Sequence, residues 1–172
     1  MPETTFAELF ASARRSALHL EMRDGYMQSD PVYADWLLGK RIDPDNLPDA
    51  YLTWRDIVGE ARRRGVDVRR ARIVGEPLSK YIRFEHEITD VVNVAAGEQV
   101  RWLPRRRASD LALPGNDCWI IDTQTVQFGI FDGDGEAVSH DITTEPAVVK
   151  LCADAFEAVW ERATPHEEYQ PS

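Results

Sequence analysis

The sequence has little of several features that mark specialised classes of protein. Only two of its 172 residues are cysteines, Cys118 and Cys152, and both lie in apolar runs. This excludes a disulfide-stapled scaffold and predicts buried free thiols. No stretch approaches the roughly 20 apolar residues that a membrane helix requires. The N-terminal sequence MPETTFAEL is acidic and, unlike a signal peptide, has no long apolar segment. These absences predict a cytoplasmic protein with no membrane association.

Lysine is scarce, and acidic residues outnumber basic ones. The chain holds 3 Lys and 17 Arg against 30 acidic residues, a formal net charge of −10. Such a charge opposes general affinity for nucleic acid. The charge is unevenly spread, because residues 62–107 contain twelve basic and six acidic residues and carry +6, whereas the rest of the chain carries −16. Nucleic-acid binding is therefore not expected unless this window folds into one continuous basic face.

Complete metal-binding motifs are also missing. The segment 86–90, HEITD, begins like the zinc motif HExxH but has Asp90 in place of the second histidine. The segment 132–136, DGDGE, begins like a calcium loop, but Ala137 and Thr143 stand where that loop needs a glycine and a bidentate glutamate. We interpret the first segment as helix surface and the second as a hairpin turn, and we expect neither a metal nor a cofactor.

Hydrophobic periodicity predicts alternating helices and strands in the first half. Thr5 and Glu8 have the spacing of a capping box before a helix at about 6–14. Leu18 and Leu20 alternate with polar residues as in a strand. Residues 29–50 are largely irregular, with one short apolar segment that favours a helix. The other elements expected here are a helix at 48–64 that stops at Gly65, a strand at 66–74 and a helix at 77–96.

The second half predicts adjacent strands closed by a helix. Strands are expected at 99–103, 118–122, 126–132 and 136–142, with a hairpin turn at 132–135 and a final helix at about 145–163. This order predicts an α/β fold of three layers, a mixed sheet flanked by helices. We expect a single domain over 1–172, with a helix, strand and irregular segment at 1–50, an α/β core at 50–165 and a frayed tail at 166–172.

One hairpin, from Leu113 to Asp132, has a form associated with phosphodiester chemistry. An apolar strand ends at Asp122, a short turn follows, and a second alternating strand runs to Asp132. It resembles the hairpin that carries the HxKxxxxD signature in phospholipase D-like domains. In that register Gly115 replaces the histidine and Asp117 replaces the lysine, and only Asp122 agrees. In active members the histidine is the covalent nucleophile and the lysine binds phosphate oxygens, so the resemblance implies a domain without that catalysis.

The sequence around this hairpin is similar to one half of a phospholipase D-like domain, as found without catalysis in TrmB-type and some LuxR-type transcription regulators. The matching landmarks are Gly65-Val66, the helix from Pro77, Gly97 to Arg101, the strand to Asp122 and the helix ending Trp160 to Pro165. Active domains of this superfamily join two halves across the catalytic strands. A single half therefore implies a homodimer or a different protein as partner.

A second resemblance covers nearly the whole chain. It is carried by LEMRDGY (20–26), VGEPLSKYIRFE (74–85), AAGEQVRWLPR (95–105), NDCWIID (116–122) and FEAVWERATPHEEY (156–169). These segments closely resemble an actinobacterial family of unknown function, commonly encoded beside helix-turn-helix regulators of the WhiJ type. The resemblance implies such a regulator as a partner.

Arginine residues are the main candidates for a binding site. Arg70 and Arg72 share one face of the strand expected at 66–74, and Arg105 and Arg106 follow the next predicted strand. If these strands are parallel, their carboxyl ends line the crevice where open α/β sheets bind ligands. Arginine there would hold a phosphate, a carboxylate or an acidic partner by paired hydrogen bonds. The alternative is that these arginines pair with acidic residues of their own chain.

A second candidate cluster lies beside Pro77, where Tyr81 and Arg83 accompany Glu76. The alternative for this cluster is a corner between strand and helix held by hydrogen bonds. Asp117 and Asp122 complete the set of candidate ligand- or partner-binding residues.

Three functions follow from these observations. The preferred one is a non-catalytic regulatory or interaction module that partners a transcription regulator. The runner-up is a phosphate-ligand-binding enzyme or hydrolase that uses a non-standard site, with Arg72, Arg105 and Asp117 in its pocket. The third is a nucleic-acid-binding module.

Overall fold

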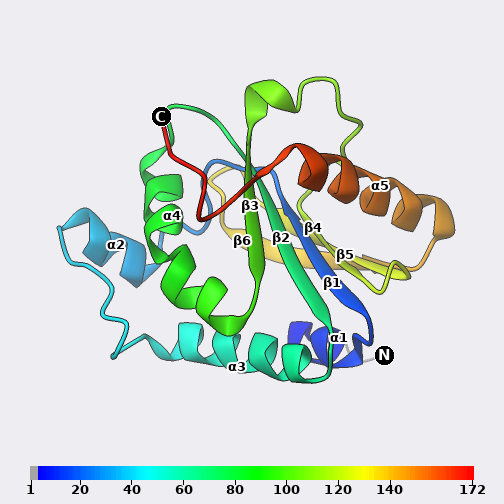
Figure 1. Ribbon diagram of the computed structural model, residues 1–172, viewed down its shortest axis with the longest axis horizontal. Coiled ribbons are helices and arrows are strands. Elements are labelled where there is room, and N and C mark those ends of the chain that lie inside the picture. The colour runs from blue at the N-terminus through cyan, green and yellow to red at the C-terminus, as the bar shows by residue number, and fades with distance from the viewer. Residues whose placement is uncertain (1–3) are drawn as a thin grey trace.

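The computed structural model describes residues 4–172 and shows one mixed sheet of seven strands (Figure 1). The order across the sheet is β6-β5-β4-β1-β2-β3-β7. Three neighbouring strands are parallel, namely β1 (Ser16–Glu21), β2 (Asp67–Val74) and β3 (Gln99–Pro104). The antiparallel strands are β4 (Cys118–Ile121), β5 (Thr125–Phe131) and β6 (Ala137–Thr143) on one side and β7 (Thr164–Pro165) on the other.

Helices cover both faces of this sheet. On one face lie α1 (Phe6–Ser12), α3 (Asp49–Arg63) and α4 (Lys80–Val92), with α2 (Pro31–Leu37) packed on α4. On the other face α5 (Pro146–Arg162) lies alone. Two short 3₁₀ turns, Val94–Ala96 and Arg105–Arg107, flank β3. The predicted three-layer α/β fold is therefore confirmed. Among the described residues, no helix has the length and apolar character needed to cross a membrane.

Side-chain caps set where the helices begin. The predicted capping box is present, because Thr5 N donates to Glu8 Oε2 at 2.8 Å and Glu8 N donates to Thr5 Oγ1 at 3.2 Å. The helix expected from residue 77 begins only at Lys80, since Ser79 Oγ accepts a hydrogen bond from Ile82 N at 3.1 Å and is the cap. It also ends earlier than expected, at Val92.

The two faces of the sheet differ in character. On one face Leu18, Leu20, Ile73 and Val126 pack with Phe156 of α5 in an apolar core. On the other face apolar side chains occupy the ends of the strands, under α3 and α4. Between these two apolar clusters the face is polar, and it carries Arg70, Arg72 and Asp117, three of the candidate binding residues.

The end of the chain is packed rather than frayed. Trp102 Nε1 donates a hydrogen bond to His166 Nδ1 at 3.0 Å, and the ring of Tyr169 stacks on that of Trp102 at 5.4 Å. The Tyr169 hydroxyl donates to Glu76 Oε1 at 2.8 Å. The predicted frayed tail is therefore wrong for His166 and Tyr169, because two aromatic side chains in a polar segment are enough to dock it on α4 and β3.

Candidate functional site

The polar face is built from two rows of side chains that cross the sheet. In the first row Gln127 of β5, Trp119 of β4, His19 of β1 and Arg70 of β2 lie opposite one another in register. The rings of His19 and Trp119 stack at 4.2 Å with an interplanar angle of 9°. Because every second residue of a strand faces the same side, the next positions along these strands form the second row.

The second row contains the candidate that occupies the lysine position of the phospholipase D signature. Gly129 N donates to Asp117 O at 2.9 Å, and Glu21 lies opposite Arg72 on the neighbouring strand. Asp117 precedes β4 and is buried on this face. Gly129 has no side chain, and the ring of Phe131 lies close to this position, since a Cβ here would be 3.1 Å from Phe131 Cε2.

A cavity of about 620 Å³ lies over these rows. Its floor includes side chains of the two rows, and its walls come from elements far apart in the sequence. The wall residues are Phe6 of α1, Trp54 of α3, Tyr81 and Glu85 of α4, and Tyr26 in the segment after β1. The cavity is thus lined by aromatic rings with charged groups between them.

Two buried arginines are held by carboxylates at the base of this cavity. Arg70 donates to Glu21, and its Nε lies 2.9 Å from Glu98 Oε2. Arg72 Nε lies 2.7 Å from Glu21 Oε2, and its Nη2 lies 2.8 Å from Glu85 Oε2. Glu21 therefore binds both guanidinium groups. Burial opposes ionisation of Glu21, but the charges of Arg72 and Arg70 outweigh it and hold its pKa below the usual range.

The other two carboxyl groups that line the cavity are less well compensated. Asp117 accepts hydrogen bonds from Met22 N at 2.9 Å and from the Tyr26 hydroxyl. Burial nevertheless raises the pKa of Asp117 to about 6, with a further contribution from the negative charge of Glu21. Burial also raises the pKa of Glu85, against the opposing charge of Arg72. His19 is neutral, because burial and the charge of Arg70 lower its pKa to about 3.

Two polar groups of residues that line the cavity have no hydrogen-bond partner among residues 4–172. Gln127 is 6% exposed, and its side-chain amide makes no hydrogen bond with any residue from 4 to 172. The buried Trp54 Nε1 also lacks a hydrogen-bond partner within the same residues. Buried polar groups are nearly always hydrogen-bonded in native structures. The cavity therefore presents the unused amide of Gln127 to whatever occupies it.

The structure brings four of the residues proposed from the sequence to this place. Arg70, Tyr81 and Asp117 line the cavity, and Arg72 lies directly behind Glu21 and Glu85. Arg70 and Arg72 project from the middle of the sheet face, and both pair with acidic residues of their own chain. The geometry of Arg70 and Arg72 therefore agrees with the alternative stated above, in which these arginines pair with acidic residues of their own chain.

Arg105 and Arg106 lie at a different place, at the carboxyl ends of β2 and β3. They line a separate depression of about 460 Å³ together with Gly75 and Pro77. The strands are parallel there, as the argument from the sequence required. Arg105 Nη2 donates to Met22 O at 2.7 Å and lies 3.0 Å from an Asp24 oxygen. Arg105 therefore connects the ends of neighbouring strands.

Asp122 and Arg83 also lie outside the cavity. Asp122 has φ of +53°, and its carboxylate accepts hydrogen bonds from the backbone N–H groups of Arg14, Arg15 and Ser16 at 2.7 to 2.9 Å. It anchors the start of β1 to the turn after β4. Arg83 Nε donates to Leu78 O at 3.3 Å and lies on another part of α4.

Sequence reasoning missed Glu21, Glu85, His19 and Gln127. A signal for the first of these was present, because two arginines in phase on one strand face require acidic neighbours if that face is buried. His19 and Glu21 alternate with Leu18 and Leu20, and so share the side of the sheet opposite the α5 core. The contribution of Glu85 and Gln127 depends on tertiary packing and strand order.

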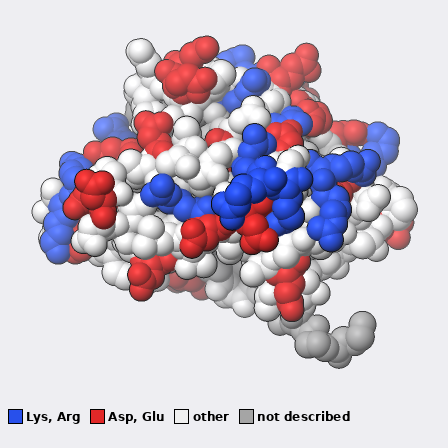
Figure 2. Space-filling model, turned by 60° about the horizontal axis from the view of Figure 1, so that its bottom comes forward, with Lys and Arg blue, Asp and Glu red and all other residues white. Residues whose placement is uncertain are grey.

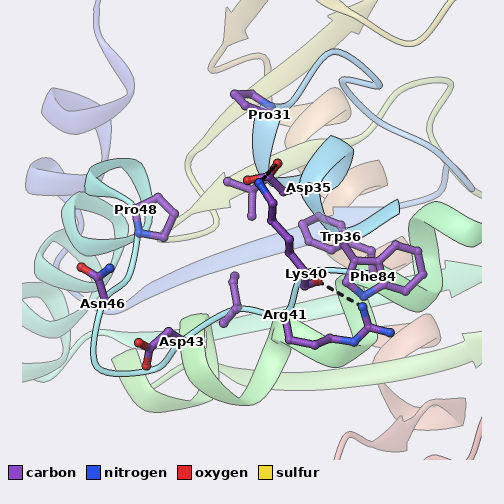
Figure 3. A pocket seen from close by; sticks show the side chains of 11 residues that line it. Pro31, Asp35, Trp36, Lys40, Arg41, Asp43, Asn46, Pro48 and Phe84 are labelled. Carbon is purple, nitrogen blue, oxygen red and sulfur yellow. Dashed lines mark hydrogen bonds and ion pairs between the residues drawn. The ribbon is translucent and has the colours of Figure 1, made fainter. Parts of the chain in front are cut away.

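A smaller pocket of about 270 Å³ lies beside α2 (Figure 3). Lys40 Nζ is 2.8 Å from an Asp35 oxygen, and Arg41 Nε is 3.0 Å from Glu87 Oε1. The Arg41 guanidinium also lies 5.4 Å from the ring centre of Trp36. Because its cationic groups are paired within the chain, this pocket offers less to a ligand than the cavity on the sheet.

The basic window of the sequence does not form one surface. Figure 2 shows Lys and Arg gathered on the side of the molecule that carries α3, with acidic residues among them. Arg62 and Arg63 are in the last turn of α3, beside the start of β2. Arg70 and Arg72 are buried, and the arginines after β3 lie at the opposite end of the parallel strands. The continuous basic face needed for nucleic-acid binding is therefore absent from the described part of the chain.

The fold is similar to that of a solved structure. NucT from Helicobacter pylori superimposes with a TM-score of 0.51 at 11% sequence identity, and the match covers 92% of this chain and 87% of that chain. The chain itself belongs to the family described as domain of unknown function DUF6879, whose model matches residues 4–171. No curated protein matches it.

Proposed function

We propose that this protein is a non-catalytic ligand-binding module with a regulatory role, acting with a helix-turn-helix transcription regulator. The observation that carries the proposal is the cavity over the sheet, with its buried charges and the unpartnered amide of Gln127. A cavity of this size that retains unsatisfied polar groups is characteristic of binding sites.

The residues at the signature positions support a role without phosphodiester chemistry. Gly115 has no side chain to act as a nucleophile, and Asp117 replaces a cation with a carboxyl group. His19, the histidine that lines the cavity, is stacked on Trp119 and neutral, and its Nδ1 lies 3.4 Å from Glu21 Oε1. Arg105 does not line the cavity, which weighs against the enzyme in which Arg72, Arg105 and Asp117 share a pocket.

The exposed edge of the sheet supports the homodimer implied by the phospholipase D resemblance. Strand β6 is the last strand on its side, and Val138 and Ile142 are 58% and 40% exposed. In antiparallel pairing of two copies centred on residue 140, Val138 of one copy faces Ile142 of the other. Apolar residues thus meet apolar residues across the new pair, as stable strand pairing requires.

The ligand-binding function is tested with a thermal-shift library screen on the purified full chain. Gln127→Ala and Gln124→Ala are matched variants, because both change glutamine on the same hairpin but Gln124 is exposed. We expect compounds that raise the Tm of wild type and of the Gln124→Ala variant, with a smaller shift for Gln127→Ala. Equal shifts for all three proteins, or no stabilising compound, would contradict ligand binding in this cavity.

The regulatory function is tested by co-purification with a helix-turn-helix regulator of the WhiJ type, the partner that the family resemblance implies. Hydrolysis of a generic phosphodiester, bis(p-nitrophenyl) phosphate, is measured on the same preparation. We expect a stable complex and no hydrolysis above buffer. If the protein hydrolyses this substrate and the Asp117→Asn variant does not, the non-catalytic function is wrong and the phosphate-ligand-binding enzyme or hydrolase is favoured.

A further inference from the structure

Acidic side chains outnumber basic ones in the lining of the cavity. Three carboxyl groups, those of Glu21, Glu85 and Asp117, line the cavity together with one guanidinium, that of Arg70. Directly behind this wall, Arg72 and Glu98 add one charge of each sign. The lining of the cavity therefore carries an excess of negative charge.

The arginines of the site have little capacity left for an anionic ligand. Arg70 is bound by Glu21 and by two oxygens of Glu98, with Nη2 at 3.0 Å from Glu98 Oε1. Arg72 is bound by Glu21, Glu85 and the hydroxyl of Thr89, the last at 2.7 Å. An anion entering the cavity would meet guanidinium groups that are already neutralised, and carboxyl groups beside them.

Asp117 has no ion-pair partner in the described part of the chain. Its two oxygens accept from a backbone N–H and a phenol, both neutral donors. The charge of Arg23 acts on Asp117 through its field alone, and its guanidinium lies 5.0 Å from the ring centre of Phe131. A ligand cation is the missing partner for this carboxyl group.

The walls suit a cation that carries a flat apolar body. The rings of Phe6, Tyr26, Trp54, Tyr81, Trp119 and Phe131 line the cavity. Aromatic faces attract cations, and Arg70 already uses two of them, at 5.4 Å from Trp54 and 5.5 Å from Trp119. The amide of Gln127, which makes no hydrogen bond with the described residues, would bind a polar atom of such a ligand.

We propose that this cavity binds an organic cation, an ammonium or amidinium group on a planar apolar body, with Asp117 as its counter-ion. The inference rests on the proposed ligand-binding function and adds the chemical class of the ligand. An acidic cavity alone would not carry it, but the buried and unpartnered Gln127 independently indicates an occupant.

Proton release should accompany binding of the cation. In the empty site burial raises the pKa of Asp117 to about 6 and raises that of Glu85, so both hold protons more readily than exposed carboxyl groups. Glu21, Tyr26 and Arg23 act on Asp117, and Arg72, Glu21, Arg70 and Tyr81 act on Glu85. A bound cation favours the ionised carboxylate, so affinity rises as pH increases through about 6.

The test uses three indole probes of similar shape in isothermal titration calorimetry on the full chain. Tryptamine is a cation, tryptophol is neutral and indole-3-acetate is an anion. We expect tryptamine to bind at least about tenfold more tightly than the other two at pH 7, as a desolvated cation–π and ion-pair contact implies. We also expect its affinity to be several-fold weaker at pH 5.

Matched variants locate the effect. Asp117→Asn keeps a group that accepts from Met22 N and should weaken tryptamine binding about tenfold while leaving tryptophol unchanged. Asp56→Asn removes the same charge from an exposed position of α3, the helix that carries Trp54, and should change neither.

The outcomes separate this inference from the function on which it rests. If tryptophol or indole-3-acetate binds as well as tryptamine, or if Asp117→Asn leaves tryptamine binding unchanged, the cationic class is wrong and the ligand-binding function stands. If tryptamine does not bind while the library screen yields other ligands whose binding depends on Gln127, the cationic class is again wrong and the ligand-binding function stands. If no compound binds, both proposals are overturned.

Discussion

The hydroxyl of Tyr26 donates a hydrogen bond to Asp117, 91 residues further along the chain. Asp117 stands where the phospholipase D signature has its lysine, and it faces a cavity lined by aromatic rings and further carboxyl groups. This carboxyl group accepts hydrogen bonds only from neutral donors among the described residues. The proposed cation site rests on that arrangement.

Removing this phenol should destabilise the protein and raise the pKa of Asp117 further. Tyr26→Phe deletes a donor that favours the ionised carboxyl group, and the loss should cost about 1 to 3 kcal/mol of unfolding free energy at pH 7. Urea denaturation measures the cost. Tyr33→Phe is the control, since the Tyr33 hydroxyl makes no hydrogen bond with the described residues. Equal effects of the two substitutions would exclude a specific role for the Tyr26–Asp117 bond.

Substitution of Glu21 should lower the free energy of unfolding more than substitution of an exposed carboxylate. Glu21→Gln removes the charge that binds both Arg70 and Arg72, and leaving buried guanidinium groups undercompensated typically costs about 3 to 5 kcal/mol. Glu60→Gln, which removes an exposed partner of Arg64, should stay within about 1 kcal/mol of wild type. Chemical denaturation of both variants makes the comparison. A Glu21→Gln variant as stable as the control would show that the network contributes little.

The stability of the empty protein should contain an unfavourable contribution from Asp117 as pH rises. Its pKa is about 6 in the folded chain against an ordinary value of 3.8, so the native state binds the proton more tightly than the unfolded state. The stabilisation that the bound proton provides is fully present below pH 3.8 and is lost as pH rises through 6, about 3 kcal/mol in all.

Asp117→Asn removes that dependence. Relative to wild type, the variant should gain stability steadily between pH 4 and pH 7, as followed by urea denaturation at each pH. Asp56→Asn serves as the control and should show no such trend. A constant difference between Asp117→Asn and wild type would mean that Asp117 is ionised throughout this range.

The docked tail should contribute measurably to stability. Tyr169→Ala loses the stacking on Trp102 and the hydrogen bond to Glu76, and should cost about 3 kcal/mol. Removal of residues 170–172 should have a much smaller effect. Thermal and urea unfolding followed by tryptophan fluorescence measure both. If Tyr169→Ala unfolds like wild type, the packing of the tail does not stabilise the fold.

The homodimer should depend on the edge strand β6. Val138→Lys places a charge opposite Ile142 of the other copy and should convert the dimer to a monomer in analytical ultracentrifugation. Leu151→Lys makes the same change at an exposed position of α5 and should leave the dimer intact. A monomeric wild-type protein, or a Val138→Lys dimer, would contradict pairing through β6.

Much of the architecture could be predicted from local patterns. The capping box of Thr5 and Glu8, the stop at Gly65 and the turn at 132–135 all depend on residues within a few positions of one another, and each forms as expected. The predictions failed where distant groups decide. Ser79 sets the start of α4. Tyr169 packs on Trp102, which is far away in the sequence, so local periodicity could not predict this contact.

The candidate site could be predicted only in part from the sequence, again because distant groups decide which side chains meet. Arg70, Arg72, Tyr81 and Asp117 were proposed from the sequence, and all four meet at the cavity. Arg105, Arg106, Arg83 and Asp122 were proposed with them and lie elsewhere, since their contacts depend on which strand ends and loops become neighbours.

By itself, the sequence determined the alternation of helices and strands, the mixed sheet, and the presence of Gly115 and Asp117 before the strand that ends at Asp122. These properties depend on residue identity and short-range periodicity. Only the tertiary structure decided that Glu21 sits between Arg70 and Arg72, that Gln127 has no partner, and that the cavity carries more carboxyl groups than guanidinium groups. Strand order and register set which side chains become neighbours, and they are settled by the packing of the whole chain.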